Sequence, residues 1–310
     1  MDMVSFLKAA IQSGTPLLFA TLGEIMTEKS GNLNLGVEGM MLVGAVVGFQ
    51  VGLVTSNPAL ALLGAAAAGA ASALIFAFLT VTLKANQVVT GLSLTILGTG
   101  FSGFAGKILV GEIVPQQIKE FFKPLIIPGL GNIPIIGEVF FTHNMFVYLG
   151  YVIALGLGIY LYHTRKGLNL RMVGENPSAA DASGINVDLY KYVHILIGGA
   201  LCGLGGAYLS LVYVPAWQEN VTAGRGWIAV ALVIFATWSP YKALIGSYFF
   251  GGLDIIGFRL QKYDIKISQY IFDMLPYVVT ILVLIMVSTK KSKEHMAPKG
   301  LGNAYFREER

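Results

Sequence analysis

Long apolar runs separated by short polar segments occupy most of this chain. The clearest runs cover residues 59–83, 88–109, 145–162, 193–214 and 270–287. Each is close to or above the roughly 20 residues that cross the hydrocarbon core of a bilayer. The runs lack the period-two alternation of barrel strands, and a helix satisfies its own backbone hydrogen bonds in lipid. The pattern therefore predicts an all-α, polytopic membrane helical bundle.

We expect about nine spanning helices of bilayer length, in a single transmembrane domain of residues 1–289 that is followed by a basic tail, residues 290–310. The expected spans are 9–27, 35–54, 58–83, 88–110, 144–163, 192–214, 226–240, 241–258 and 269–289. Inverted repeats within this bundle are a further expectation, argued below from two polar segments.

The orientation follows from Lys and Arg, which favour the cytoplasmic side of short loops. The loop 164–191 and the tail are both rich in these residues, so both are expected to be cytoplasmic and the N-terminus outside. Under this assignment Arg259, Lys262 and Lys266 fall in an external loop, which counts against it.

Composition agrees with a membrane protein. Of the 310 residues, 55% are hydrophobic and 12% are charged, and the mean hydropathy is +0.68, whereas a soluble domain is about 25% charged. Cys202 is the single cysteine, which excludes an internal disulfide and a thiolate metal site. His143, His163, His194 and His295 form no i, i+4 pair, so no metal site is expected. No removable signal peptide is expected at the N-terminus.

The longest external connection is expected at residues 111–143. Its Pro and Gly residues exclude a spanning helix, yet its many Ile, Leu and Phe residues are unusual in a solvated linker. We expect a segment that lies at the membrane interface or caps the bundle. The alternative is a docking surface for an external partner.

A polar, glycine-containing stretch, SGNLNLG (residues 30–36), leads directly into an apolar helix. Transporters place substrate near the bilayer midplane, where short or broken helices present free amides and polar side chains. Asn32 and Asn34 can bond substrate hydroxyls, and Glu38 should face the bundle interior because a carboxylate is costly in lipid. The alternative is that Asn34 caps the helix and Glu38 lies in its first turn.

A second stretch of the same kind, ENVTAGRGWIAVAL (residues 219–232), begins on the opposite predicted side of the membrane. Two such segments meeting at a central pathway are typical of inverted repeats. Trp217 and Trp227 can stack on a substrate ring, although Trp at a membrane boundary is more often an interfacial anchor. Further polar candidates for the path are Asn86, Gln87 and Thr90, and Asp254 requires a partner or a cavity inside its apolar span.

A short cytoplasmic helix is predicted from Pro177 to Ser183. Asn176 can cap it, Pro177 suits its first position, and Gly184 suits the position after its end. Such a helix is either a simple connector or a ridge that fits a groove in another protein.

Four separated motifs carry a resemblance to a known family. They are RMVGENPSAADASGINV (171–187), GEIMTEKSGNLNLGVEGMMLVGA (23–45), KANQVVTGLSLTILGTG (84–100) and GRGWIAVALVIFATWSPYKALIGSYFFG (224–251). Together, and in their order along the chain, they resemble the bacterial ABC-importer permeases that serve branched-chain amino acids, simple sugars and nucleosides, over residues 17–284. The segments NLGVEGMM and VGENPSAA look most like the nucleoside and simple-sugar permeases.

The resemblance implies a pore-forming transport subunit of the bacterial plasma membrane that is not an enzyme and binds no cofactor. A partner ATPase would use ATP, and an extracytoplasmic binding protein or lipoprotein would deliver the substrate. A second permease chain, identical or homologous, would pair with this one in the lipid. No nucleic acid partner is implied. The residues expected to contact the ATPase are Gly174, Glu175, Asn176, Pro177, Ala179, Ala180 and Gly184. The sequence agrees, because FSGFAGKI lacks the first Gly and the final Ser or Thr of a phosphate-binding loop.

Nucleosides are the preferred substrates and ribose-like sugars the alternative, since both offer hydroxyls to Asn and Gln. An ion-coupled secondary transporter has weak support from Glu38 and Asp254 alone. A membrane enzyme lacks a clustered nucleophile and base, and a channel is compatible with composition only.

Overall fold

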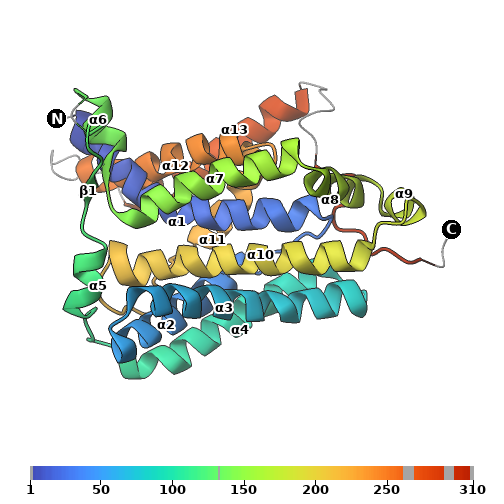
Figure 1. Ribbon diagram of the computed structural model, residues 1–310, viewed down its shortest axis with the longest axis horizontal. Helices are drawn as coiled ribbons and strands as arrows, with labels where there is room; N and C mark the ends of the chain where they lie inside the picture. Colours follow the sequence, from blue (N-terminus) through green and yellow to red (C-terminus); the bar gives the residue numbers. More distant parts are fainter. Residues whose placement is uncertain (1–2, 132, 261–268, 290–296, 308–310) are drawn as a thin grey trace.

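The computed structural model describes residues 3–131, 133–260, 269–289 and 297–307. Its long helices run side by side along one axis (Figure 1). The start of α1 (Met3–Lys29) lies at the end that also holds α5 (Gln116–Phe121) and α6 (Ile136–Phe140), and we call this the α5 end. The opposite end, which we call the α9 end, holds α8 (Arg165–Glu175), α9 (Pro177–Ala182) and residues 297–307.

The remaining elements complete the bundle. The helices are α2 (Val37–Thr55), α3 (Pro58–Ala77), α4 (Gln87–Gly106), α7 (Met145–His163), α10 (Val187–Tyr208), α11 (Arg225–Phe235), α12 (Pro240–Leu260) and α13 (Gln269–Thr289). Three short turns extend helices: η1 (Phe78–Thr82) follows α3, η2 (Lys107–Leu109) follows α4 and η3 (Leu209–Tyr213) follows α10. Strands β1 (Leu125–Ile126) and β2 (Thr142–His143) pair antiparallel.

Local sequence signals explain where several helices begin. The Asn57 side chain accepts hydrogen bonds from the N–H groups of Ala59 and Leu60, and Pro58 takes the first helical position of α3. Asn86 and Asn144 cap α4 and α7 in the same way. An Asn side chain at this position satisfies a backbone donor that the helix itself leaves unpaired.

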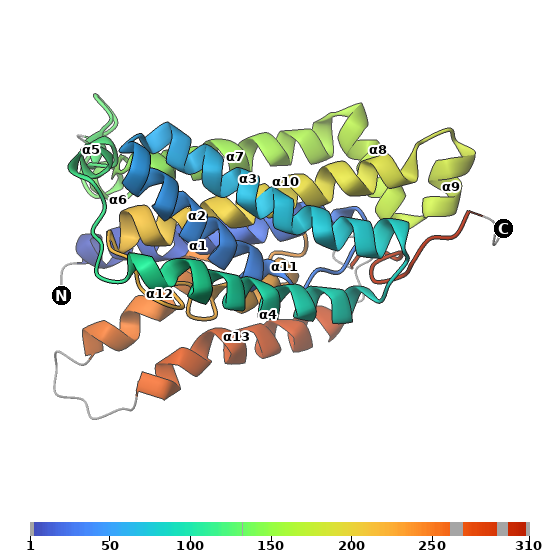
Figure 2. The ribbon, with the colours of Figure 1, turned by 90° about the horizontal axis from the view of Figure 1, so that it is seen from below.

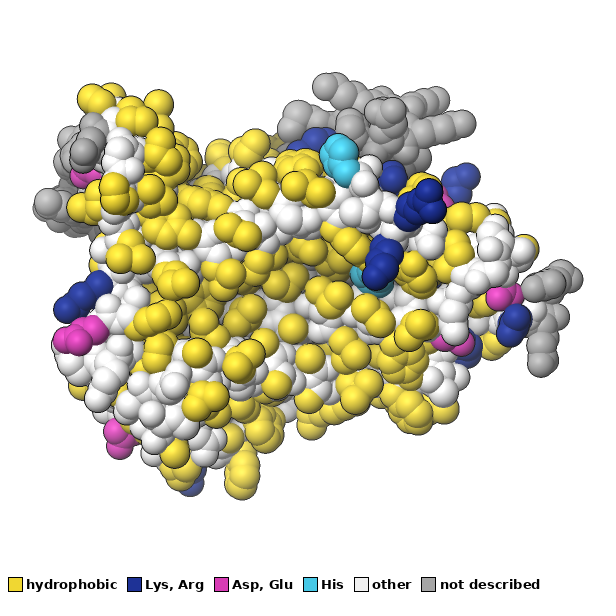
Figure 3. Space-filling view, in the orientation of Figure 1, with side chains coloured by type: hydrophobic (Ala, Val, Ile, Leu, Met, Phe, Trp, Pro, Cys, Tyr) yellow, Lys and Arg dark blue, Asp and Glu magenta, His cyan; other side chains and the backbone are white. Residues whose placement is uncertain are grey.

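Five helices of the described part are long and apolar enough to cross a membrane: 37–55, 58–82, 87–109, 145–163 and 187–213. The space-filling view agrees, because hydrophobic side chains cover much of the face that it shows between the two ends (Figure 3). A helix lies at each of the nine predicted positions, but the predicted span 226–240 is only the 11-residue α11. At 1.5 Å per residue α11 covers about 16 Å, roughly half of the hydrocarbon core.

Helix α10 lies at the centre of the bundle and packs closely against its neighbours because glycines face them. A Cβ atom added to Gly203 would lie 2.3 Å from the carbonyl oxygen of Ala65 in α3, and one added to Gly44 in α2 would lie 2.3 Å from the Cα of Gly203. Small residues of this kind let membrane helices approach until their backbones touch. Helices α4 and α13 lie on the opposite face of the bundle from α3 and α7 (Figure 2).

The described residues of the connection 111–143, all but residue 132, lie at the α5 end and form no spanning helix. It holds α5, α6 and the β1–β2 pair, and Ile118 and Val139 of these short helices are buried. Its backbone joins the segment after α10, because the Val114 N–H donates to Pro215 O at 3.2 Å and the Trp217 N–H donates to Glu112 O at 3.1 Å. The segment therefore covers the α5 end of the bundle.

Loop 164–191 and the described part of the tail, residues 297–307, lie at the same end of the molecule, which agrees with placing both on one side of the membrane. The Gly300 N–H donates to Gly174 O at 2.9 Å, which joins the tail to α8. Of the basic residues that counted against the assignment, Lys262 and Lys266 lie outside the described residues. Helix α8 was not anticipated from the sequence, because its residues 165–175 mix charges with single apolar residues rather than forming an apolar run.

Candidate functional site

Residues 30–36 form a loop that turns back into the bundle after α1 ends at the α9 end. The turn uses Gly31 at φ +88°, a conformation that favours glycine. The Leu33 N–H donates to Gln87 Oε1 at 2.7 Å, and Gly36 lies against Gly91 and Leu94 of α4. Because Gly91 is about one turn into α4, α2 begins inside the bundle rather than at its end.

Asn34 joins this loop to a carboxylate in α1. Its backbone N–H and its Nδ2 donate to the two oxygens of Glu24 at 3.1 and 3.2 Å, and its Oδ1 accepts from the Gly36 N–H at 2.8 Å. Asn34 is 1% exposed and Glu24 is fully buried. The cap position of α2 is Gly36, so Asn34 braces the turn before the helix rather than capping it.

Glu38 connects the two polar segments that the sequence singled out. Its Oε1 accepts from Thr222 Oγ1 at 2.6 Å and from the Gly224 N–H at 2.8 Å, and its Oε2 accepts from the Gly226 N–H at 2.5 Å. Gly224 is the cap of α11 and Gly226 lies in its first turn. A carboxylate from the first turn of α2 therefore satisfies the free amides at the N-terminus of α11.

The two segments enter the bundle from opposite ends. Residues 214–224 start at the α5 end, where Pro215 and Trp217 bond the 111–143 connection, and lead inward to α11. The loop 30–36 starts at the α9 end and leads inward to α2. The two inward-leading segments therefore meet at Glu38.

An ion pair lies beside the start of α11. Arg225 Nη2 is 3.0 Å from Asp254 Oδ2, which also accepts from Ser13 Oγ at 2.6 Å. The Arg225 guanidinium lies over the Tyr213 ring at 5.8 Å from its centroid. The sequence analysis expected Asp254 to need a partner, and Arg225 is that partner. The Arg225 side chain is 17% exposed and the Asp254 side chain 31% exposed, so the pair is partly accessible.

The other path candidates occupy different environments. Asn86 Oδ1 caps α4 by accepting from the Val89 N–H, and Thr90 Oγ1 donates to Asn86 O. Trp227 is half-buried on α11. Trp217 is buried against Phe49, with ring centroids 5.7 Å apart, so it packs inside the protein rather than anchoring at a boundary.

Two buried polar atoms near the loop have no hydrogen-bond partner among the residues that the structure describes. They are Asn32 Oδ1 and Gln87 Nε2. One is an acceptor and the other is a donor, and Gln87 bonds the residue that follows Asn32. Buried polar atoms are rarely left unpaired, so these two have unused hydrogen-bonding capacity.

Sequence reasoning missed a second carboxylate contact at the α9 end. Trp238, after α11, donates its indole N–H to Glu28 of α1. Glu24 and Glu28 are one turn apart in an otherwise apolar helix, and that spacing was the available signal. Their partners lie 10 and 210 residues away in sequence, so the signal alone could not supply them.

The short helix predicted from Pro177 to Ser183 is present as α9, Pro177–Ala182. Asn176 Oδ1 accepts from the Ala179 N–H at 3.0 Å, Pro177 takes the first position and Gly184 has φ +80°. Ala180 is fully buried beside Val173 and Val187, whereas Glu175 is exposed. Gly174 packs against Lys29 and Gly31 at the end of α1.

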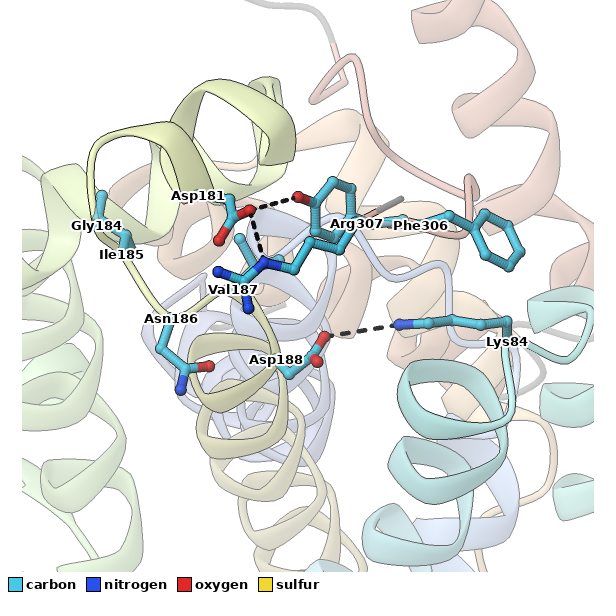
Figure 4. Close-up of a pocket in the computed structure, with 10 residues that line it drawn as sticks. Lys84, Asp181, Gly184, Ile185, Asn186, Val187, Asp188, Phe306 and Arg307 are labelled. Carbon is cyan, nitrogen blue, oxygen red and sulfur yellow. Dashed lines mark hydrogen bonds and ion pairs between the residues drawn. The ribbon is translucent and has the colours of Figure 1, made fainter. Parts of the chain in front are cut away.

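A pocket of about 510 Å³ opens beside α9 (Figure 4). It lies between the α9–α10 connection, the connection from η1 to α4 and the tail. Lys84 pairs with Asp188 at 3.6 Å across one side, and Arg307 pairs with Asp181 at 3.2 Å across the other. Its wall is therefore polar, and its charges of opposite sign are paired.

Comparison with known proteins places this architecture in a family. The family described as Branched-chain amino acid transport system / permease component matches residues 6–284. TsgC13 of Haloferax volcanii, provisionally named a glucose ABC transporter permease, is 39% identical over 97% of both chains. The guanosine ABC transporter permease NupQ of Bacillus subtilis is 35% identical over 100% of both chains. The nucleoside ABC transporter permease NupC of Lactococcus lactis is 34% identical over 99% of both chains.

The match covers the loop 30–36, the Glu38 contact and α9. The relatives are transport components, not enzymes, and they align from end to end. This chain therefore belongs to that family of ABC transporter permeases, and it is a transport subunit of the plasma membrane.

Proposed function

We propose that this chain is the permease subunit of an ATP-driven importer of nucleosides. A binding protein outside the cell delivers the substrate, and a separate cytoplasmic ATPase supplies the energy. Two relatives aligned over nearly their whole length are named for guanosine and for nucleosides. Simple sugars are the second candidate, because the relative with 39% identity is named for glucose.

The observation that carries the proposal is the meeting of two inward-leading polar segments at Glu38. Loop 30–36 and residues 214–224 bring the N-termini of α2 and α11 together inside a membrane protein. Transporters use helix ends at this depth to handle polar substrates. We propose that the two segments separate during transport and that the substrate passes between them.

In this mechanism the polar side chains of the two segments either bind the substrate as it passes or hold the segments together. The proposed path residues are Asn32, Asn34, Glu38, Asn86, Gln87, Thr90 and Trp227. Asn32 Oδ1 and Gln87 Nε2 have unused hydrogen-bonding capacity that suits the hydroxyls of a ribose. Asn34 and Glu38 use theirs within the protein, so their role is to hold the closed arrangement.

We propose that the α9 end faces the cytoplasm and contacts the ATPase. Of the residues expected to serve this contact, Glu175, Asn176, Pro177, Ala179 and Gly184 would touch the ATPase, whereas the buried Gly174 and Ala180 would hold α9 in place. Both basic segments lie at this end, which agrees with the preference of Lys and Arg for the cytoplasmic side. The N-terminus is then outside, and a second permease chain, identical or homologous, completes the pore.

Uptake by proteoliposomes that contain the assembled transporter tests the proposal. Labelled guanosine, adenosine and uridine should accumulate when ATP and the binding protein are present, and ribose and glucose should not. Inactivating the ATPase should abolish uptake, while collapsing proton and sodium gradients should leave it unchanged. If the binding protein binds ribose or glucose and does not bind nucleosides, the sugar alternative is selected. Uptake that follows an ion gradient would reject the importer.

A further inference from the structure

The C-terminal segment, residues 297–307, lies against the α9 end instead of extending into solvent. Pro298 is buried, and Ala297 and Leu301 pack against the hydrophobic core. The Gly300 N–H donates to Gly174 O at 2.9 Å, at the end of α8. A segment that was expected to be only a basic tail is therefore part of the folded structure.

Asp181 of α9 holds the far part of this segment. Its Oδ2 accepts from the Tyr305 hydroxyl at 3.0 Å and lies 3.2 Å from Arg307 Nε. Figure 4 shows both contacts converging on the one carboxylate. The Asp181 side chain is 12% exposed whereas that of Arg307 is 76% exposed, so the carboxylate lies beneath the segment.

The near part of the segment touches the loop that leads to the proposed path. The Gly302 N–H donates to Gly31 O at 3.3 Å, and Gly302 has φ +81°. Gly31 begins the turn of loop 30–36, whose Asn34 bonds Glu24. Residues 297–307 thus contact α9 through Asp181 and loop 30–36 through Gly31.

Charge on the α9 end favours an acidic partner. Arg165, Lys166 and Lys299 are exposed there, against the exposed acid Glu175, whereas the exposed Arg307 and Asp188 are paired with Asp181 and Lys84. In Figure 3 Lys and Arg side chains gather around α8 and α9. Such a surface steers and orients an oppositely charged protein.

We propose that residues 297–307 form one docking surface together with α9 for the cytoplasmic ATPase and transmit its movement to loop 30–36. Asp181 acts as the positioning residue that fixes the segment to α9. The pocket of about 510 Å³ is the recess of this surface, because Tyr305, Phe306 and Arg307 line it opposite the α9–α10 connection. The inference rests on the proposed function, since it takes α9 as the ATPase contact.

The test compares Asp181→Ala with Asp181→Glu and with Glu120→Ala in the assembled transporter. Glu120→Ala is the matched control, because it removes an exposed carboxylate that pairs with Lys123 at the α5 end, away from the proposed docking surface. The ATPase affinity is measured by titration against the permease in nanodiscs, and hydrogen exchange is measured at residues 30–36. A variant that ends at residue 296 removes the whole segment.

We expect Asp181→Ala to weaken ATPase binding about tenfold, to speed amide exchange at residues 30–36, and to be rescued by Asp181→Glu. The truncated chain should behave like Asp181→Ala, and Glu120→Ala should resemble the wild type. Wild-type affinity and unchanged exchange in both Asp181→Ala and the truncated chain would overturn the inference. If the wild-type chain itself binds no ATPase, the proposed function fails instead.

Discussion

The carboxylate of Glu38, in the first turn of α2, accepts a hydrogen bond from the backbone N–H of Gly226, in the first turn of α11, at 2.5 Å. The two residues are 188 positions apart in sequence, yet each begins a helix that starts inside the bundle. The contact closes the two inward-leading segments against each other. Its strength should therefore govern both the stability of the protein and the opening of the path.

Glu38→Ala should lower the stability of the permease and abolish uptake. It leaves the Thr222 hydroxyl and the amides of Gly224 and Gly226 without their acceptor, and we expect a loss of about 3 kcal/mol from unpaired buried groups. Thermal unfolding in detergent and uptake in proteoliposomes measure the two effects. Glu120→Gln, an exposed change at the α5 end, is the control. Equal melting temperatures for Glu38→Ala and the control would contradict the prediction.

Asn34→Leu should reduce uptake strongly while the protein still reaches the membrane. Leucine removes the Asn34 Nδ2 group that donates to Glu24 and the Asn34 Oδ1 atom that accepts from the Gly36 N–H. The turn before α2 loses its brace, but the apolar contacts of the bundle persist. Membrane content by immunoblot and uptake of labelled guanosine separate the two effects. Normal uptake at normal membrane content would limit Asn34 to a dispensable structural contact.

Arg225 and Asp254 should be coupled energetically. Each single change, Arg225→Met or Asp254→Asn, leaves the other member without its partner in a partly buried site. Because both side chains are partly exposed, we expect a cost of about 1–2 kcal/mol for each single change. The double variant should cost less than the sum, which a double-mutant cycle in thermal unfolding measures. Additive costs would show that the ion pair contributes nothing.

Acid should loosen the segment that covers the α5 end. Burial lowers the pKa of His143 below its ordinary value of 6.5, although the bond between its Nε2 and Val139 O, at 2.7 Å, opposes the shift. The detached segment then binds a proton more readily than the packed one. The stability of the segment is complete above pH 6.5 and falls as the pH drops towards the lowered pKa, by at most about 1.4 kcal/mol per pH unit.

Limited proteolysis of residues 111–143 at pH 7.5 and 5.5 measures this effect. The wild-type segment should be cut faster at pH 5.5, after correction for the activity of the protease. His143→Phe removes the titrating group and should make the cutting rate independent of pH. An equal pH dependence in both proteins would assign the effect to another group.

The helix positions could be predicted because their signals are local. Apolar runs fix the long helices, and Asn followed by Pro fixes the starts of α3 and α9 within one residue. The same reasoning wrongly predicted that α11 continues to residue 240, because it expects an apolar run to form one helix of bilayer length. An apolar run that continues through Thr237 and Trp238 looks long enough to span, but both residues have positive φ and the helix ends at Phe235.

The polar segments of the candidate site could be predicted from the sequence, but the contacts between them could not. Glycine and polar residues before an apolar run identified both segments and Glu38. The partners of Glu38 lie 184 to 188 residues away, and no local pattern encodes them. The attachment of residues 297–307 to Asp181 and Gly31 was missed for the same reason, because it depends on where α9 and the end of α1 lie in the folded bundle.

Two alanines of α9 should respond differently to enlargement. Ala180 is fully buried against Val173 and Val187, so Ala180→Trp overfills that contact and should displace α9 itself. Ala182 is exposed, so Ala182→Trp leaves the helix in place and should block only the approach of the ATPase. Both variants should lose transport. Hydrogen exchange at residues 177–183 should increase in Ala180→Trp and stay unchanged in Ala182→Trp, while co-purification of the ATPase falls in both. Normal uptake and normal co-purification with Ala182→Trp would show that α9 is a connector and not the contact with the ATPase.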